Sequence, residues 1–111
     1  MARKAKPVEA GSGNVFKDLG FADANKRKLK VQLAMRLNDL IEAKAYTRAQ
    51  VAELFGMPQP HVSELVNYRL NRFSSERLMH FMTLLDRDVQ IVIRPKAVRR
   101  RRGTVSVLVT V

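Results

Sequence analysis

A row of polar side chains runs through residues 59–67, where apolar residues recur at helical spacing as Val62, Leu65 and Val66. On a helix, this spacing puts four polar residues on the face opposite the apolar stripe: Gln59, His61, Ser63 and Glu64. Such side chains donate and accept hydrogen bonds, which is how proteins contact base edges and phosphate oxygens. The chemistry that this face supports is recognition by hydrogen bonding.

Few other residues in the sequence could carry out chemistry. The chain has no cysteine, and neither of its histidines, His61 and His80, lies near a pair of carboxylates at a recognisable spacing. No glycine-rich loop suited to phosphate is present. We therefore expect no enzymatic activity, no metal site and no cofactor.

The composition fits one small globular domain with excess positive charge. The 111 residues are 46% hydrophobic and 28% charged, and the formal net charge is +11. Much of this charge lies near the two ends, at Arg3, Lys4 and Lys6 and in residues 96–102. Since DNA, RNA and acidic proteins all attract such tails, charge alone does not identify the partner. Without a membrane-spanning run or signal peptide, we expect a soluble cytoplasmic protein with no membrane partner.

Apolar spacing and capping residues predict four helices. The first spans about residues 24–44, where leucines recur every three or four positions. The second follows Thr47, a suitable N-cap, and stops before Gly56, which adopts the left-handed conformation that ends helices. The third carries the polar row, and the fourth begins after Ser74 or Ser75.

The turn between the second and third of these helices is very short. Ala52 is small enough to let the two helices approach, Gly56 makes the turn, and Met57 and Val62 fill the angle between them. This arrangement predicts a helix-turn-helix unit, whose second helix enters the major groove of DNA. A helical pair with a purely structural role is the alternative.

After the fourth helix the apolar period changes from about 3.6 to two residues. Val89, Ile91 and Ile93 alternate with other residues and Pro95 ends the run, so residues 89–94 are predicted to form a β-strand. The last residues, from 104 onwards, form either a second strand or a frayed tail.

The chain is thus expected to have three parts and a mainly α fold of four to five helices with a C-terminal β-strand or hairpin. Residues 1–14 are a flexible basic arm, because they contain almost no apolar side chains to bury. Residues 15–94 form the helix-turn-helix domain with its terminal strand, and residues 95–111 are a basic linker followed by the last segment. The short apolar segment 15–21 either packs on the core or binds a partner.

The sequence TRAQVAELFGMPQPHVSELVN, which begins at Thr47, resembles the helix-turn-helix of the lambda-repressor/Cro-like regulators, also called the xenobiotic-response-element (XRE) family. The resemblance covers about residues 24–86. The apolar segment before the first helix and the strand after Asp88 resemble those of small antitoxin-type members. This implies a homodimer that binds a palindromic operator in double-stranded DNA, represses its own operon and has a cognate toxin as a further partner.

The resemblance also implies roles for individual residues. The family places a glutamine that contacts bases at the start of the recognition helix, so Gln59 would contact adenine, although it could instead cap its own helix. Arg48 replaces a glutamine that braces the recognition residue and touches phosphate, a contact that arginine also suits. Tyr68 either joins the backbone contacts or packs on the core. The backbone contacts after the recognition helix would be Asn67, Arg69 and Arg72.

The remaining polar residues of the recognition helix leave alternatives open. The hydroxyl of Ser63 suits a base or a phosphate, and we place it with the base contacts. His61 is expected to bind phosphate. Glu64 either accepts a hydrogen bond from a cytosine amino group or stays solvated, because a carboxylate repels phosphates. Pro60 lacks a donor that a small polar residue would supply.

Two further expectations concern assembly and function. A single recognition helix contacts few base pairs and an edge strand needs a partner, so we expect Val89, Ile91 and Ile93 to pair with a two-fold mate. The arginines of residues 99–102 are expected to contact phosphate without discriminating between sequences. The alternative function is a protein-binding antitoxin or interaction module for which DNA binding is secondary. RNA binding is less favoured, because stacking aromatics are absent from the expected strands.

Overall fold

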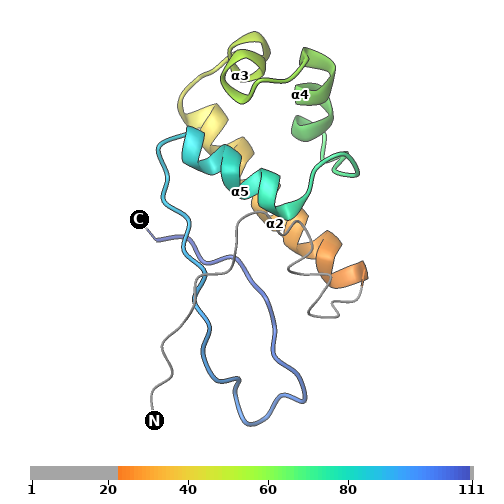
Figure 1. Ribbon diagram of the computed structural model, residues 1–111, viewed down its shortest axis with the longest axis vertical. Coiled ribbons are helices and arrows are strands. Elements are labelled where there is room, and N and C mark those ends of the chain that lie inside the picture. The colour runs from red at the N-terminus through yellow and green to blue at the C-terminus, as the bar shows by residue number, and fades with distance from the viewer. Residues whose placement is uncertain (1–22, 111) are drawn as a thin grey trace.

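The computed structural model describes residues 23–110, so the expected arm at 1–14 and the apolar segment 15–21 lie outside the described residues. Four helices lie within this part of the chain: α2 (Asp23–Ala43), α3 (Arg48–Phe55), α4 (Gln59–Val66) and α5 (Ser75–Leu84). Helices α2 and α5 lie side by side, and α3 and α4 together form one end of the molecule (Figure 1). The four helices predicted from the sequence are confirmed, with their ends shifted by one or two residues.

Local capping explains where α3 begins and ends. The Thr47 Oγ1 accepts a hydrogen bond from the Gln50 backbone N at 3.1 Å, and the Gln50 Oε1 accepts one from the Thr47 backbone N at 2.8 Å. This reciprocal pair satisfies two amides that a helix start otherwise leaves free. At the other end Gly56 has φ +65°, a left-handed conformation that costs glycine little. Both predictions, the Thr47 cap and the Gly56 stop, are confirmed.

Of the two serines predicted to cap α5, Ser74 and Ser75, the N-cap is Ser74. Its Oγ accepts a hydrogen bond from the Arg77 backbone N at 3.0 Å, whereas Ser75 is the first helical residue and is buried. Glu76 lies in the first turn, where a negative charge favours the helix dipole. The predicted inward face of α5 is buried, as expected: Leu78, Phe81, Met82 and Leu85.

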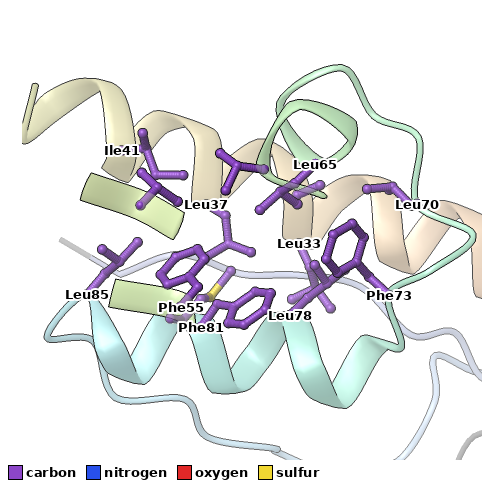
Figure 2. Packing of buried hydrophobic residues seen from close by; sticks show 14 of the residues in the cluster. Leu33, Leu37, Ile41, Phe55, Leu65, Leu70, Phe73, Leu78, Phe81 and Leu85 are labelled. Carbon is purple, nitrogen blue, oxygen red and sulfur yellow. The ribbon is translucent and has the colours of Figure 1, made fainter. Parts of the chain in front are cut away.

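The core lies between α2 and α5 and extends under α3 and α4 (Figure 2). Helix α2 buries one stripe along its length, consisting of Leu29, Leu33, Leu37 and Ile41. At the centre the rings of Phe55 and Phe81 are stacked, with centroids 4.2 Å apart and planes 2° from parallel. The Phe73 ring meets Phe81 edge-on at 6.1 Å. These aromatic contacts join α3, α5 and the loop before α5, and so hold the helix-turn-helix on the rest of the domain.

The β-strand predicted for residues 89–94 is not formed, and residues 23–110 contain no strand. Ile91 is 65% exposed and Ile93 is 90% exposed, so the alternation of apolar residues does not correspond to a buried face in one protomer. A strand requires a neighbouring backbone, and residues 89–94 form no backbone hydrogen bond with any described segment. The fold is therefore mainly α, without the expected C-terminal strand.

The last segment is neither a strand nor wholly frayed. Residues 103–110 run back towards the helices, and Val107 packs against the core cluster. Between the two extended stretches the chain reverses at a turn in which the Arg100 backbone N donates to the Ala97 carbonyl at 3.1 Å. The basic run 99–102 lies at this turn, at the opposite end of the molecule's longest axis from α3 and α4 (Figure 1).

Candidate nucleic-acid interface

The angle between α3 and α4 is set by a tight turn and by buried apolar side chains. The Met57 backbone N donates to the Ala52 carbonyl at 3.0 Å, which satisfies a carbonyl at the end of α3, and Met57 itself is buried. Pro58 then occupies the N-cap position of α4, where it has no side-chain capping bond. Val51, Val62 and Leu65 are fully buried on the inner faces of the two helices. The outer face of α4 is consequently fixed in direction and carries the polar row.

Gln59 is exposed at the first position of α4 and does not cap the helix, because Pro58 holds the N-cap position. Its side chain has no hydrogen-bond partner among residues 23–110. Of the two roles considered for Gln59, capping is therefore wrong for this structure. Its amide remains available to an external group that offers both an acceptor and a donor, which is the pattern of adenine in the major groove.

Ser63 lies at the centre of a small polar network. The Arg48 Nη1 donates to the Ser63 Oγ at 3.1 Å, and the Asn67 Nδ2 donates to the same oxygen at 3.4 Å. The Asn67 Nδ2 also donates to the Ser63 carbonyl at 2.8 Å. Arg48, at the start of α3, thus braces Ser63 in the middle of α4, not Gln59 at its start. Three of the predicted contact residues are brought together here.

Glu64 forms an ion pair that the sequence did not indicate. Its Oε1 accepts a hydrogen bond from the Arg72 Nε at 3.0 Å, and both side chains remain partly exposed. An exposed pair of this kind contributes little to stability, about 0–1 kcal/mol. Its effect is local: the carboxylate is partly neutralised by Arg72, so it presents less repulsion to phosphates than a solvated Glu64 would. Among residues 23–110 the Nη1 and Nη2 groups of Arg72 have no partner, so they can bind an external anion.

The loop after α4 is held on the core and presents its polar residues outwards. Leu70 and Phe73 are buried, and the Arg69 backbone N donates to the Glu64 carbonyl at 2.8 Å. Arg69 itself is exposed. Tyr68 is 45% exposed and has φ +59°, so it does not pack on the core, and its backbone lies in the left-handed region that glycine prefers. No sequence pattern predicts a tyrosine there.

Within residues 23–110, no group of three or more metal-ligating side chains lies close enough together to hold a metal ion. His61 is half-buried on α4, whereas His80 is exposed on α5. None of the four described helices is long and apolar enough to cross a membrane.

Comparison with known proteins agrees with this geometry. The family described as a helix-turn-helix domain matches the chain over residues 15–94. A solved structure described as a candidate transcriptional regulator of the XRE family is 43% identical, with a TM-score of 0.77. The match covers 80% of this chain and 100% of that one. No curated protein shows significant similarity to the chain.

Proposed function

The chain belongs to the helix-turn-helix domain family, and we propose that it is a transcriptional regulator that binds double-stranded DNA sequence-specifically through α4. The observation that carries the proposal is the outer face of α4. On this face Gln59 has no hydrogen-bond partner among residues 23–110 and Ser63 is held by Arg48, while Val62 and Leu65 on the inner face are fully buried. The proposal is further supported by Arg69 and Arg72, which are exposed in the loop after α4 and carry guanidinium groups that suit phosphate oxygens.

Selection of binding sites from a pool of random duplexes tests this function. A sequence-specific regulator enriches one motif and then binds it at least about 10³-fold more tightly than random DNA at physiological salt. Recovery of no motif, together with equal affinity for every duplex, would contradict the proposal.

We further propose that the protein binds its operator as a homodimer and that residues 89–94 pair across the two-fold axis. Ile91, Val92 and Ile93 are 65%, 77% and 90% exposed, and a monomer would leave these side chains and their backbone groups in water. Pairing with a second copy supplies the neighbouring backbone that a single protomer lacks. A dimer also doubles the recognised sequence and makes the operator palindromic.

Replacing Ile91 with proline is expected to weaken dimerisation and operator binding together. Proline removes a backbone donor and resists pairing in the middle of a strand, whereas the exposed Ile91 side chain contributes little to the monomer core. The control is Val98→Pro, because Val98 is 95% exposed and follows Ala97 in the turn closed by Arg100, where proline is well accommodated.

Sedimentation at micromolar concentration, followed by titration of the operator, separates these outcomes. Wild type and Val98→Pro should sediment as dimers, and Ile91→Pro as a monomer with weakened binding. A monomeric wild type would disprove the proposed dimer.

Repression of the protein's own operon and a role as an antitoxin are the most specific form of this proposal. They are supported by the resemblance to small antitoxin-type regulators and by the exposed apolar side chains of residues 89–109, which suit a protein partner.

The same apolar surface favours the second candidate function, a protein-binding module for which DNA binding is secondary. An adjacent reading frame for a small basic protein, together with its co-purification from the native host, would support the toxin partner. Enrichment of the protein's own promoter during site selection would support autorepression.

The position of residues 99–102 argues against the phosphate contacts expected from the sequence, so we now expect their arginines to add little to operator affinity. If all four contacted phosphate, changing them to glutamine would lower the salt slope by roughly 3 to 4 per chain, at about 0.9 per contact. Since this run lies at the far end of the molecule from α4, we expect a decrease below about 1. Operator binding measured at salt concentrations between about 50 and 200 mM gives the salt slope and so decides between the two expected decreases. A decrease of 3 or more would mean that the arginines of residues 99–102 do contact the DNA.

A further inference from the structure

Within residues 23–110, the hydroxyl of Ser63 accepts hydrogen bonds but does not donate one. A serine hydroxyl has one proton to donate and two lone pairs that accept. Both lone pairs have partners, the Arg48 Nη1 at 3.1 Å and the Asn67 Nδ2 at 3.4 Å. The proton has no acceptor among residues 23–110, and Ser63 is only half-buried. What Ser63 can still offer to an external group is therefore its donor.

We propose that Ser63 is a fixed hydrogen-bond donor that contacts an acceptor atom of the DNA, a purine N7, guanine O6, thymine O4 or phosphate oxygen. This inference rests on the proposed DNA-binding function. A free serine hydroxyl rotates and pairs with donors and acceptors alike, so it discriminates poorly between base pairs. With Arg48 and Asn67 directed at its lone pairs, Ser63 is a poor acceptor for the amino group of cytosine or adenine. Arg48 and Asn67 thereby act as positioning residues that set the specificity of Ser63.

The two donors are themselves held by the fold. Arg48 is the first residue of α3, directly after the capping box of Thr47 and Gln50. Asn67 is the C-cap of α4, and its amide is tied to the Ser63 carbonyl at 2.8 Å. One donor comes from α3 and the other from the end of α4. Together they fix the Ser63 oxygen as an acceptor within the protein and leave its proton for an external group. Arg48 also carries a positive charge next to the hydroxyl, which further favours an acceptor atom over an amino group.

The test uses the full-length protein and the duplex that wild type selects. Ser63→Ala should weaken operator binding about 2- to 12-fold, the loss expected for one neutral hydrogen bond. Ser63→Thr keeps the hydroxyl and should retain most of the affinity. Ser106→Ala, at an exposed serine of the C-terminal segment, is the matched control and should bind as wild type does.

Modified duplexes identify the acceptor atom on the DNA. They also separate the loss of a direct Ser63 contact from an indirect effect, since Ser63→Ala also frees the Arg48 side chain from its hydrogen bond to Ser63. If a base is the partner, the loss is confined to the operator, and a 7-deazapurine, or an analogue without the guanine O6 or thymine O4, reproduces it. If a phosphate is the partner, the loss also appears on random duplexes, and an uncharged methylphosphonate at one position reproduces it. In both cases wild type loses affinity for the modified duplex and Ser63→Ala loses nothing further.

Two results would overturn the inference while leaving the proposed function intact. One is a wild type that binds its operator and a Ser63→Ala variant that binds it equally well. The other is a loss that is reproduced by deleting a cytosine N4 or adenine N6 amino group, because Ser63 would then act as an acceptor. If wild type itself binds no duplex, the proposed function fails, and this inference fails with it.

Discussion

Phe81→Ala is expected to lower the free energy of unfolding by about 3–5 kcal/mol, the largest effect of any single substitution considered for this protein. Phe81 is 1% exposed and stacks on Phe55 at 4.2 Å, while Phe73 meets its ring edge-on. Truncation would therefore remove both contacts and leave a cavity at the point where α3, α5 and the preceding loop meet. Arg77, whose guanidinium lies 5.3 Å from the ring centroid, would lose one of its two aromatic partners.

Thermal and urea denaturation measure this effect. A domain of this size loses about 4–8 °C in Tm for each kcal/mol, so Phe81→Ala should melt more than 10 °C below wild type. The control is Leu108→Ala, because Leu108 is 81% exposed and its truncation should change stability by no more than about 0.5 kcal/mol. A loss below about 1 kcal/mol for Phe81→Ala would mean that the aromatic cluster does not hold the helices together.

The helices could be predicted from the sequence because their signals are local. The Thr47 capping box, the Gly56 stop and the apolar stripe of α2 all depend on residues within one or two turns of each other. Side-chain hydrogen bonds and a left-handed glycine act over the same distance. For this reason the predicted helix ends lie within one or two residues of those observed.

The strand predicted for residues 89–94 is not formed within one protomer, because the signal for a strand is not local. Alternating apolar residues indicate that one face of a segment is suited to burial, but a strand forms only where another backbone lies alongside. No described segment pairs with residues 89–94, so the pattern in Val89, Ile91 and Ile93 was insufficient for a single protomer. Such a pattern has the same appearance whether its partner is intramolecular or a second copy.

The candidate site was predicted in part. The periodicity of α4 correctly placed Gln59 and Ser63 on the outer face, because burial of Val62 and Leu65 fixes the opposite side. The pairing of Glu64 with Arg72 could not be predicted, since the two residues are eight positions apart across the end of a helix and no periodicity relates them. The same holds for the contact of Arg48 with Ser63, fifteen positions away, which depends on the angle between α3 and α4.

Gln59→Ala and Arg69→Ala are expected to affect DNA binding in different ways. A glutamine that contacts adenine through two hydrogen bonds contributes about 1–3 kcal/mol to discrimination against other bases, so its truncation should weaken operator binding by that amount and leave random DNA nearly unaffected. Arg69 faces solvent after α4 and would contact a phosphate, which is the same in every sequence. Its truncation should weaken binding to both kinds of duplex and lower the salt slope by about 0.9 per chain. Neither substitution removes a buried side chain, so both variants should fold normally.

Competition titration of Gln59→Ala against the operator and a scrambled duplex, at fixed salt and beside wild type and Arg69→Ala, tests most directly whether α4 recognises DNA sequence. The melting temperatures of both variants are first checked against wild type. We expect Gln59→Ala to lose affinity for the operator alone, and Arg69→Ala to lose affinity for both duplexes. Equal losses on both duplexes for Gln59→Ala would remove this residue from base recognition. A loss of binding confined to variants that neutralise Arg3, Lys4 and residues 99–102 would contradict the assignment of α4 as the recognition helix.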